Sequence, residues 1–414
     1  MAGNLISLLP VMIVIFLILL LLFFMHDKPE RFFFFLVCYF VLDSSTLFEL
    51  KVIIRVEDIN IFPEDLLTIL LALEFFSSLS NRNLPRVLTG SKYRIVGKTF
   101  LLLSIFGLIT WTYSRGIQTA VVNWRENLLD CFLILYCFSL KSWLNYRFYS
   151  SVIFRSSLFL SVMILARIAI HGIGNFSQLS NDTRSTDRAT TAAGALFLLF
   201  ALWNYLIQIH TLNLKNFFYI LMIVGEILIL QHRSVWVALL IGVMFLLWKL
   251  NIVELRFRIV ALSLIIAPIL FLAVRSSPIL SSAASDSGTL TWRILRWQGS
   301  LEQSKSFVQI LIGSVFGNLD QITVAGLSVA AHNMYITLFE KFGIVGVILY
   351  LSLLIPHKKL NVKKMDHGNI DSLMTITLIA FGFFYSFPYI AIIVFFALRR
   401  IRSQLYWEAE NSNY

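Results

Sequence analysis

The sequence predicts an all-α membrane protein, a polytopic bundle of helices that crosses the lipid bilayer many times. Only 14% of the 414 residues are charged, against roughly 25% in ordinary soluble domains. The mean hydropathy is +0.80, and apolar runs long enough to cross a bilayer recur along the chain. Because the hydrocarbon core holds no water, each backbone amide must be bonded within its own segment, which favours helices.

The apolar runs give the expected helices in order. The first run is followed by Met25-His26-Asp27-Lys28 and not by a small-residue cleavage site, so we expect it to be retained. The last run contains Phe387-Pro388, which predicts either a bent helix or two short passes. In all, about twelve to thirteen membrane helices are expected, at 5–24, 32–47, 62–79, 99–113, 127–140, 152–171, 190–209, 216–231, 234–250, 258–274, 334–355 and 372–398.

The charge of the connecting loops predicts the topology. Basic residues concentrate in alternate loops, such as 82–98 and 358–364, which the positive-inside rule assigns to the cytoplasm. The net charge of +11 therefore reports topology and not nucleic acid binding. The alternation places the N-terminus and a large loop outside. The chain thus divides into an N-terminal bundle (1–274), the large external loop (275–333), and C-terminal helices with a short cytoplasmic tail (334–414).

Arginine and histidine side chains gather on the side predicted to be external. Arg233 lies in a tight turn between two apolar runs, Arg293 and Arg296 share one face of a helix expected over 291–312, and His332 closes the large loop. Arginine binds phosphate oxygens through a planar fork, and neutral histidine accepts a proton from an attacking hydroxyl. These residue types fit glycosyl transfer from a polyprenyl-diphosphate sugar.

Each of these residues also has a structural interpretation. The arginines could be attracted to lipid phosphates, and the histidine could be an interfacial residue without a role. A further basic candidate, Arg188, lies in an outer loop that could simply be solvated. The sequence has no carboxylate cluster at metal spacing in the large loop and no Gly-rich phosphate loop, Cys-x-x-Cys or His-Glu-x-x-His. We therefore expect neither a metal nor a cofactor.

Four motifs in the second half of the chain together resemble one known family. They are Gln231-His232-Arg233-Ser234, Thr291-Trp292-Arg293-Ile294-Leu295-Arg296-Trp297, the glycine-punctuated segment Gly313 to Gly317, and His332-Asn333-Met334-Tyr335 with Gly343-Ile344-Val345-Gly346 downstream. This half resembles the superfamily of O-antigen ligases and O-antigen (Wzy-type) polymerases. His232 departs from the pattern, because Ser or Thr is more usual there. The first 120 residues carry no motif of the family.

The resemblance implies a GT-C-like fold and a metal-independent inverting glycosyltransferase. Such an enzyme uses undecaprenyl-diphosphate-linked oligosaccharide in the bacterial inner (cytoplasmic) membrane, with its active site facing the periplasm. The family's essential histidine matches His332, and its essential arginines match Arg233 and Arg293. Further diphosphate-binding positions are Arg296 and Arg188, with Asn333, Tyr335 and His232 in support. The implied partners are the lipid-linked substrate, membrane lipid and a chain-length regulator protein.

The resemblance leaves open which acceptor is used. A polymerase joins one lipid-linked repeat-unit chain to another, whereas a ligase moves the finished glycan onto the lipid A core. The Trp-Arg-x-x-x-Trp helix and the Phe-rich membrane portion favour the polymerase. A polysaccharide flippase is the alternative from another class, but it would place charges in the middle of many helices and have short loops on both sides.

The topology can be tested by cysteine labelling. A cysteine introduced at Ser285 should react with an impermeant thiol reagent in intact spheroplasts, because the 275–333 loop is expected outside. A cysteine at Lys363 should react only after permeabilisation. The reverse labelling pattern would contradict the placement of the candidate site.

Overall fold

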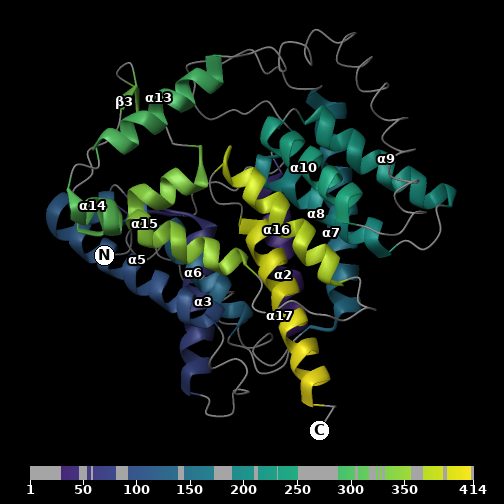
Figure 1. Cartoon of the computed structure of the whole chain (residues 1–414), viewed down its shortest axis with the longest axis horizontal. Helices are drawn as coiled ribbons and strands as arrows, with labels where there is room; N and C mark the ends of the chain where they lie inside the picture. Colours follow the sequence, from purple (N-terminus) through teal and green to yellow (C-terminus); the bar gives the residue numbers. More distant parts are fainter. Residues whose placement is uncertain are drawn as a thin grey trace, which may run out of the picture.

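The computed structural model describes most of the chain as helices (Figure 1). Within the described residues the protein has thirteen α-helices and two very short antiparallel strand pairs. The predicted helices 5–24 and 258–274 lie outside these residues. The described ranges are 29–45, 54–56, 59–80, 92–138, 144–171, 189–208, 213–230, 232–249, 288–303, 306–316, 323–324, 327–328, 332–355, 367–385 and 389–411.

Each predicted apolar span in the described ranges coincides with a helix, and the last span is two helices. The helices are α2 (Pro29–Ser44), α3 (Pro63–Ser80), α5 (Lys92–Arg115), α6 (Ile117–Cys137), α7 (Tyr146–His171), α8 (Ala192–Gln208), α9 (Leu214–Ile229), α10 (Arg233–Lys249), α13 (Gly288–Gln303), α14 (Phe307–Ile312), the 3-10 helix η1 (Gly313–Phe316), α15 (Met334–Leu354), α16 (His367–Gly382) and α17 (Tyr389–Asn411). The strands are β1 (Ile54–Val56), β2 (Ile59–Ile61), β3 (Thr323–Val324) and β4 (Leu327–Ser328). Among the described helices, α5, α7 and α15 are long and apolar enough to cross a bilayer, as expected of a multi-pass membrane protein.

The prediction of one continuous helix over 291–312 is wrong. It is divided into α13 and α14, and Ser306 starts the second helix with a capping box. The Ser306 hydroxyl accepts a bond from the Gln309 amide (3.1 Å), and the Gln309 side chain accepts one from the Ser306 amide (3.3 Å). The predicted break at Gly313 is confirmed, since this residue ends α14 with a φ of 66°.

The bundle is built around helices that are buried on nearly all sides. Residues 194–204 of α8 and 390–401 of α17 are buried throughout. A helix that is apolar all round must be surrounded by other helices, and α8 is in contact with α7, α9, α10, α16 and α17. The more amphipathic helices therefore lie around this centre, and the candidate site residues lie at its margins.

At one end of the bundle, hydrogen bonds to backbone carbonyls join the end of α2 to the residues just before α8 and α10. The carbonyl of Ser44 accepts bonds from the Thr191 amide (2.9 Å) and the Thr190 hydroxyl (2.7 Å). The imidazole of His232 is bonded to the carbonyl of Thr190 (2.9 Å). These contacts bring together the end of one helix and the starts of two others, as the predicted external loops require.

At the opposite end, a buried arginine joins four helices. Arg399 of α17 is 2% exposed and forms an ion pair with Asp371 of α16. Its guanidinium also donates to the Tyr93 hydroxyl of α5 (3.0 Å) and the Leu354 carbonyl of α15 (2.6 Å). A buried charge is tolerated only when it is paired and fully hydrogen-bonded. The helix ends gathered here are those whose loops are predicted to be cytoplasmic; that assignment stays a prediction.

Two glycines allow η1 to cross α15 in direct backbone contact. Gly313 and Gly343 have φ values of 66° and 63°, with ψ values of −144° and −159° that only glycine adopts readily. A Cβ atom on Gly343 would lie 2.4 Å from the carbonyl of Leu311, and one on Gly313 would lie 2.6 Å from the amide of Gly343. Gly343 also interrupts α15, which therefore consists of two helical parts.

Replacing Gly343 by Ala should destabilise the protein. The backbone conformation alone costs a non-glycine residue about 1–3 kcal/mol, and the overlap with Leu311 adds to this cost. Thermal unfolding of the purified protein would measure the loss. Gly225→Ala on α9 is the matched control, because nothing lies within 4 Å of its Cβ position, and it should be neutral or slightly stabilising. Equal melting temperatures for the two variants would contradict the glycine crossing.

Candidate functional site

His332 directly precedes Asn333, the N-cap residue of α15. Its φ is 45°, in the left-handed region that non-glycine residues seldom adopt and histidine tolerates better than most. The side chain of Asn333 makes two hydrogen bonds. Its side-chain oxygen caps α15 by accepting a bond from the Ile336 amide (3.1 Å), and its side-chain nitrogen donates to the carbonyl of Phe383 (3.0 Å). The backbone next to His332 is thus fixed by the hydrogen bonds of its neighbour Asn333.

Arg293 and Arg233 accompany His332, although the three residues come from separate parts of the chain. Burial lowers the pKa of His332, and the positive charge of Arg293 lowers it further. Burial also lowers the pKa of Arg293, followed by the charge of Arg233 at the first position of α10, while Tyr385 opposes this shift. Arg293 therefore links the predicted base to the second predicted arginine, and we call these three residues the cluster.

The cluster combines a neutral imidazole with two cations. Because its pKa is below the ordinary value of 6.5, His332 is neutral near pH 7 and can accept a proton. The Nε of Arg293 is buried and has no hydrogen-bond partner in the described part of the chain. Two guanidinium groups that repel each other favour an anion between them. The arrangement suits a phosphate-bearing ligand beside a proton acceptor.

Arg296 is bound by Glu340 and Ser300. It forms an ion pair with Glu340 of α15 (2.6 Å), and the hydroxyl of Ser300 also donates to that carboxylate (2.6 Å). The side chains of Arg296 and Glu340 are 9% and 15% exposed. A buried pair of this kind fixes α13 against α15. Diphosphate binding by Arg296 stays a prediction, and its geometry supports a positioning role.

The supporting residues of the sequence prediction also have structural partners. Tyr335 faces α16, where its hydroxyl donates to the Ile379 carbonyl (3.0 Å) and its ring lies 4.8 Å from that of Phe383. His232 is buried against Thr190, as described above. Arg188 lies outside the described residues, whereas Thr190, two positions later, lies at the same end of the bundle as His232.

Sequence reasoning missed Glu340, Ser300 and Tyr385. Glu340 carried a usable signal, because a carboxylate within an apolar segment such as 334–355 needs a partner or a function. Ser300 and Tyr385 carried none, since serine and tyrosine are common at helix ends. Their places depend on how α13 and α16 pack against α15, which no local pattern encodes.

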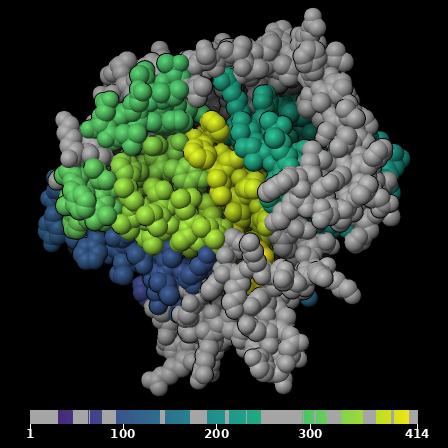
Figure 2. All heavy atoms as spheres, viewed as in Figure 1, coloured from purple at the N-terminus to yellow at the C-terminus, as the bar shows by residue number. Residues whose placement is uncertain are grey.

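The surface carries these elements on one face. Figure 2 shows α13 and α14 beside α15, with α16 next to them and a hollow between α13 and α16. Within the described residues, no group of histidine, cysteine and carboxylate side chains could hold a metal ion.

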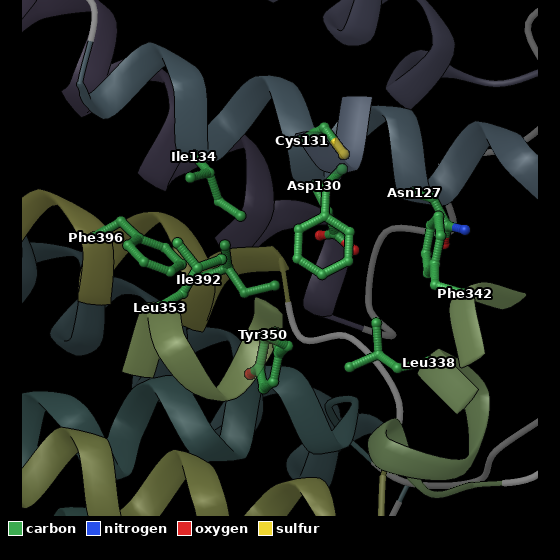
Figure 3. Close-up of a pocket in the computed structure, with 11 residues that line it drawn as sticks. Asn127, Asp130, Cys131, Ile134, Leu338, Phe342, Tyr350, Leu353, Ile392 and Phe396 are labelled. Atoms are coloured by element: carbon green, nitrogen blue, oxygen red, sulfur yellow. The ribbon is translucent and has the colours of Figure 1, made fainter. Parts of the chain in front are cut away.

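A separate cavity lies deeper, between α5, α6, α15 and α17 (Figure 3). It measures about 30 Å³ and is lined mainly by apolar side chains, with Asp130 and Asn127 of α6 and Tyr350 of α15 among them. A single water molecule needs about 10–15 Å³ on this measure. The cavity is therefore too small for a sugar or a diphosphate and is no candidate for the substrate site.

Comparisons with protein-family models, curated proteins and solved structures found no match for this chain.

The coupling between Arg293 and His332 can be measured directly. Replacing Arg293 by Gln should raise the pKa of His332, because a neighbouring positive charge disfavours the imidazolium. The pKa should stay below its ordinary value, since burial is the larger cause and remains. Deuterium exchange at the imidazole Cε1, followed by mass spectrometry across a pH series, reports this pKa. Arg155→Gln, at an exposed position on α7, should leave it unchanged, and an equal shift in both variants would contradict the coupling.

Proposed function

We propose that this protein is a membrane glycosyltransferase that moves a glycan from an undecaprenyl-diphosphate donor to an acceptor hydroxyl. The observation that carries the proposal is the cluster, in which burial and Arg293 lower the pKa of His332 and Arg233 lowers the pKa of Arg293. The resemblance in the motifs around these residues supports the same reaction. The bundle supplies the membrane setting that a polyprenyl-linked donor requires.

In the proposed reaction, His332 accepts the proton of the acceptor hydroxyl as its oxygen attacks the anomeric carbon of the donor sugar. The bond between that carbon and the diphosphate oxygen breaks, with inversion at the carbon. Arg293 and Arg233 stabilise the negative charge that develops on the departing diphosphate. The products are the extended glycan and undecaprenyl diphosphate, and the proton is released from the imidazolium to water.

The acceptor in this proposal is another lipid-linked repeat unit, which makes the protein an O-antigen (or related surface polysaccharide) polymerase of the inner membrane acting at its periplasmic face. A chain-length regulator protein is its expected partner. Ligation to the lipid A core is the alternative, and the two differ only in the acceptor. Incubating the purified protein with lipid-linked repeats alone distinguishes them, because only a polymerase makes longer chains without a core acceptor.

A specific observation favours a second candidate, a polysaccharide flippase. Asp130, Glu226 and Lys341 all lie within apolar helices, and charges inside helices are characteristic of transporters. Two of them have local hydrogen bonds: Glu226 accepts from Ser161 (2.7 Å), and Lys341 donates to the Asn123 carbonyl (2.8 Å). A flippase would move lipid-linked oligosaccharide across the bilayer of sealed vesicles without lengthening it.

The catalytic role of His332 is tested by His332→Gln in the full-length protein reconstituted in nanodiscs. Glutamine keeps hydrogen bonding but cannot accept a proton, so release of undecaprenyl diphosphate should fall by about 10²–10⁴-fold. In the His332→Ala variant, this release should fall by at least as much. Arg155→Gln, at an exposed position on α7 with no part in the candidate site, is the control variant and should keep most of the activity.

Melting temperatures and membrane yields of the three variants verify that they are folded. A His332→Gln protein that polymerises at nearly the normal rate would refute proton abstraction by this residue. The wild-type protein could instead translocate the substrate without releasing undecaprenyl diphosphate or lengthening chains. That result would refute the glycosyltransferase proposal in favour of the flippase.

A further inference from the structure

The short segment formed by α14 and η1 presents apolar side chains outward although it lies in the predicted external loop. Phe307 is 77% exposed, Val308 52%, Leu311 42% and Phe316 55%. The segment from Phe307 to Phe316 contains no charged residue. A face of this kind on a water-exposed loop is costly, so something apolar must cover it.

The inward side of the segment is fixed to two candidate membrane helices. Gly313 lies against the backbone of α15 at Gly343. On α5, the indole nitrogen of Trp111 donates to the carbonyl of Ser314 (2.8 Å), and the Thr110 hydroxyl donates to the carbonyl of Val315. Trp111 is four residues before the end of α5 at Arg115, which is about 6 Å along a helix. The segment therefore contacts α5 about one helical turn inward from the end of this candidate membrane span.

The outward side of the segment continues the apolar surface of α5. Phe106, Ile109 and Tyr113 flank Thr110 on that helix and are 56%, 47% and 90% exposed. Because α5 is a candidate membrane span, its exposed apolar residues face lipid. Figures 1 and 2 show α14 beside α5 at the edge of the molecule. The two apolar surfaces adjoin and require the same surroundings.

The backbone groups at both ends of the segment also fit a lipid environment. Hydrocarbon offers no hydrogen-bond partners, so each terminal amide or carbonyl there must be bonded to protein. The Ser306 and Gln309 capping box serves the amides at the start of α14. Trp111 and Thr110 serve the carbonyls of η1 at its other end. A segment lying in water would not need donors from a neighbouring helix.

We propose that α14 and η1 form a re-entrant segment embedded in the bilayer, with Phe307, Val308 and Leu311 against lipid acyl chains. The segment holds the external loop at a fixed depth in the bilayer. α13, which carries Arg293, ends just before the segment in the chain. This inference concerns where the loop sits and is independent of the chemistry proposed for His332. If one of these two proposals is refuted, the other is unaffected.

Nitroxide scanning of the full chain in lipid nanodiscs tests the proposal. Single cysteines are introduced at Phe307, Val308 and Leu311 after Cys38, Cys131 and Cys137 are replaced by Ala, and each is spin-labelled. Collisions with oxygen, which concentrates in hydrocarbon, are compared with collisions with a water-soluble nickel chelate. Ile109 on α5 is the lipid-facing reference, and Glu302, an exposed residue of α13, is the aqueous reference.

At all three positions, oxygen collisions should exceed chelate collisions, as at Ile109. The order should reverse at Glu302. Chelate collisions at Phe307 and Leu311 matching those at Glu302 would overturn the proposal, because the face would then be in water. Labels screened from both reagents would also overturn it, since protein and not lipid would then cover this face.

Discussion

The candidate site depends on the buried ion pair between Arg296 and Glu340. α13 belongs to the large loop, and this pair, reinforced by Ser300, attaches it to the first part of α15. Arg293 is one helical turn from Arg296, so the same attachment holds the part of α13 from which Arg293 lowers the pKa of His332. Removing one partner of a buried pair leaves an uncompensated charge, which typically costs about 3–5 kcal/mol. The geometry of the cluster is thus set by a pair that takes no part in it.

α15 is the common partner of the elements that surround the site. Glu340 binds α13, Gly343 receives η1, and the Leu354 carbonyl accepts a bond from Arg399 of α17. Lys341 points to the other side and donates to the carbonyl of Asn123 and the amide oxygen of Asn127 on α6. A single helix therefore contacts the large loop at one end and the C-terminal helices at the other, so a shift of α15 would change the packing at both ends of the bundle.

Local sequence patterns predicted the helices well, because apolar runs are long and uninterrupted in a membrane protein. The division of 372–398 into α16 and α17 follows Pro388, which no helix interior accommodates easily. The interruption of α15 was not predictable, since Gly343 is an ordinary membrane residue until Gly313 is known to press against it. The assignment of Arg296 as a diphosphate ligand was likewise made without knowledge of Glu340, its partner 44 positions away. Contacts between distant residues decided both points.

The break at Gly343 makes residues 334–342 a short helical part with its own beginning at Asn333. Peptide dipoles in a helix sum to a partial positive charge at its first turn. His332 is the residue just before that turn, and a positive helix end of this kind favours a negative charge placed near it. The direction of α15 thus acts on an anion at the candidate site in the same sense as the two arginines, and it does so without any side chain.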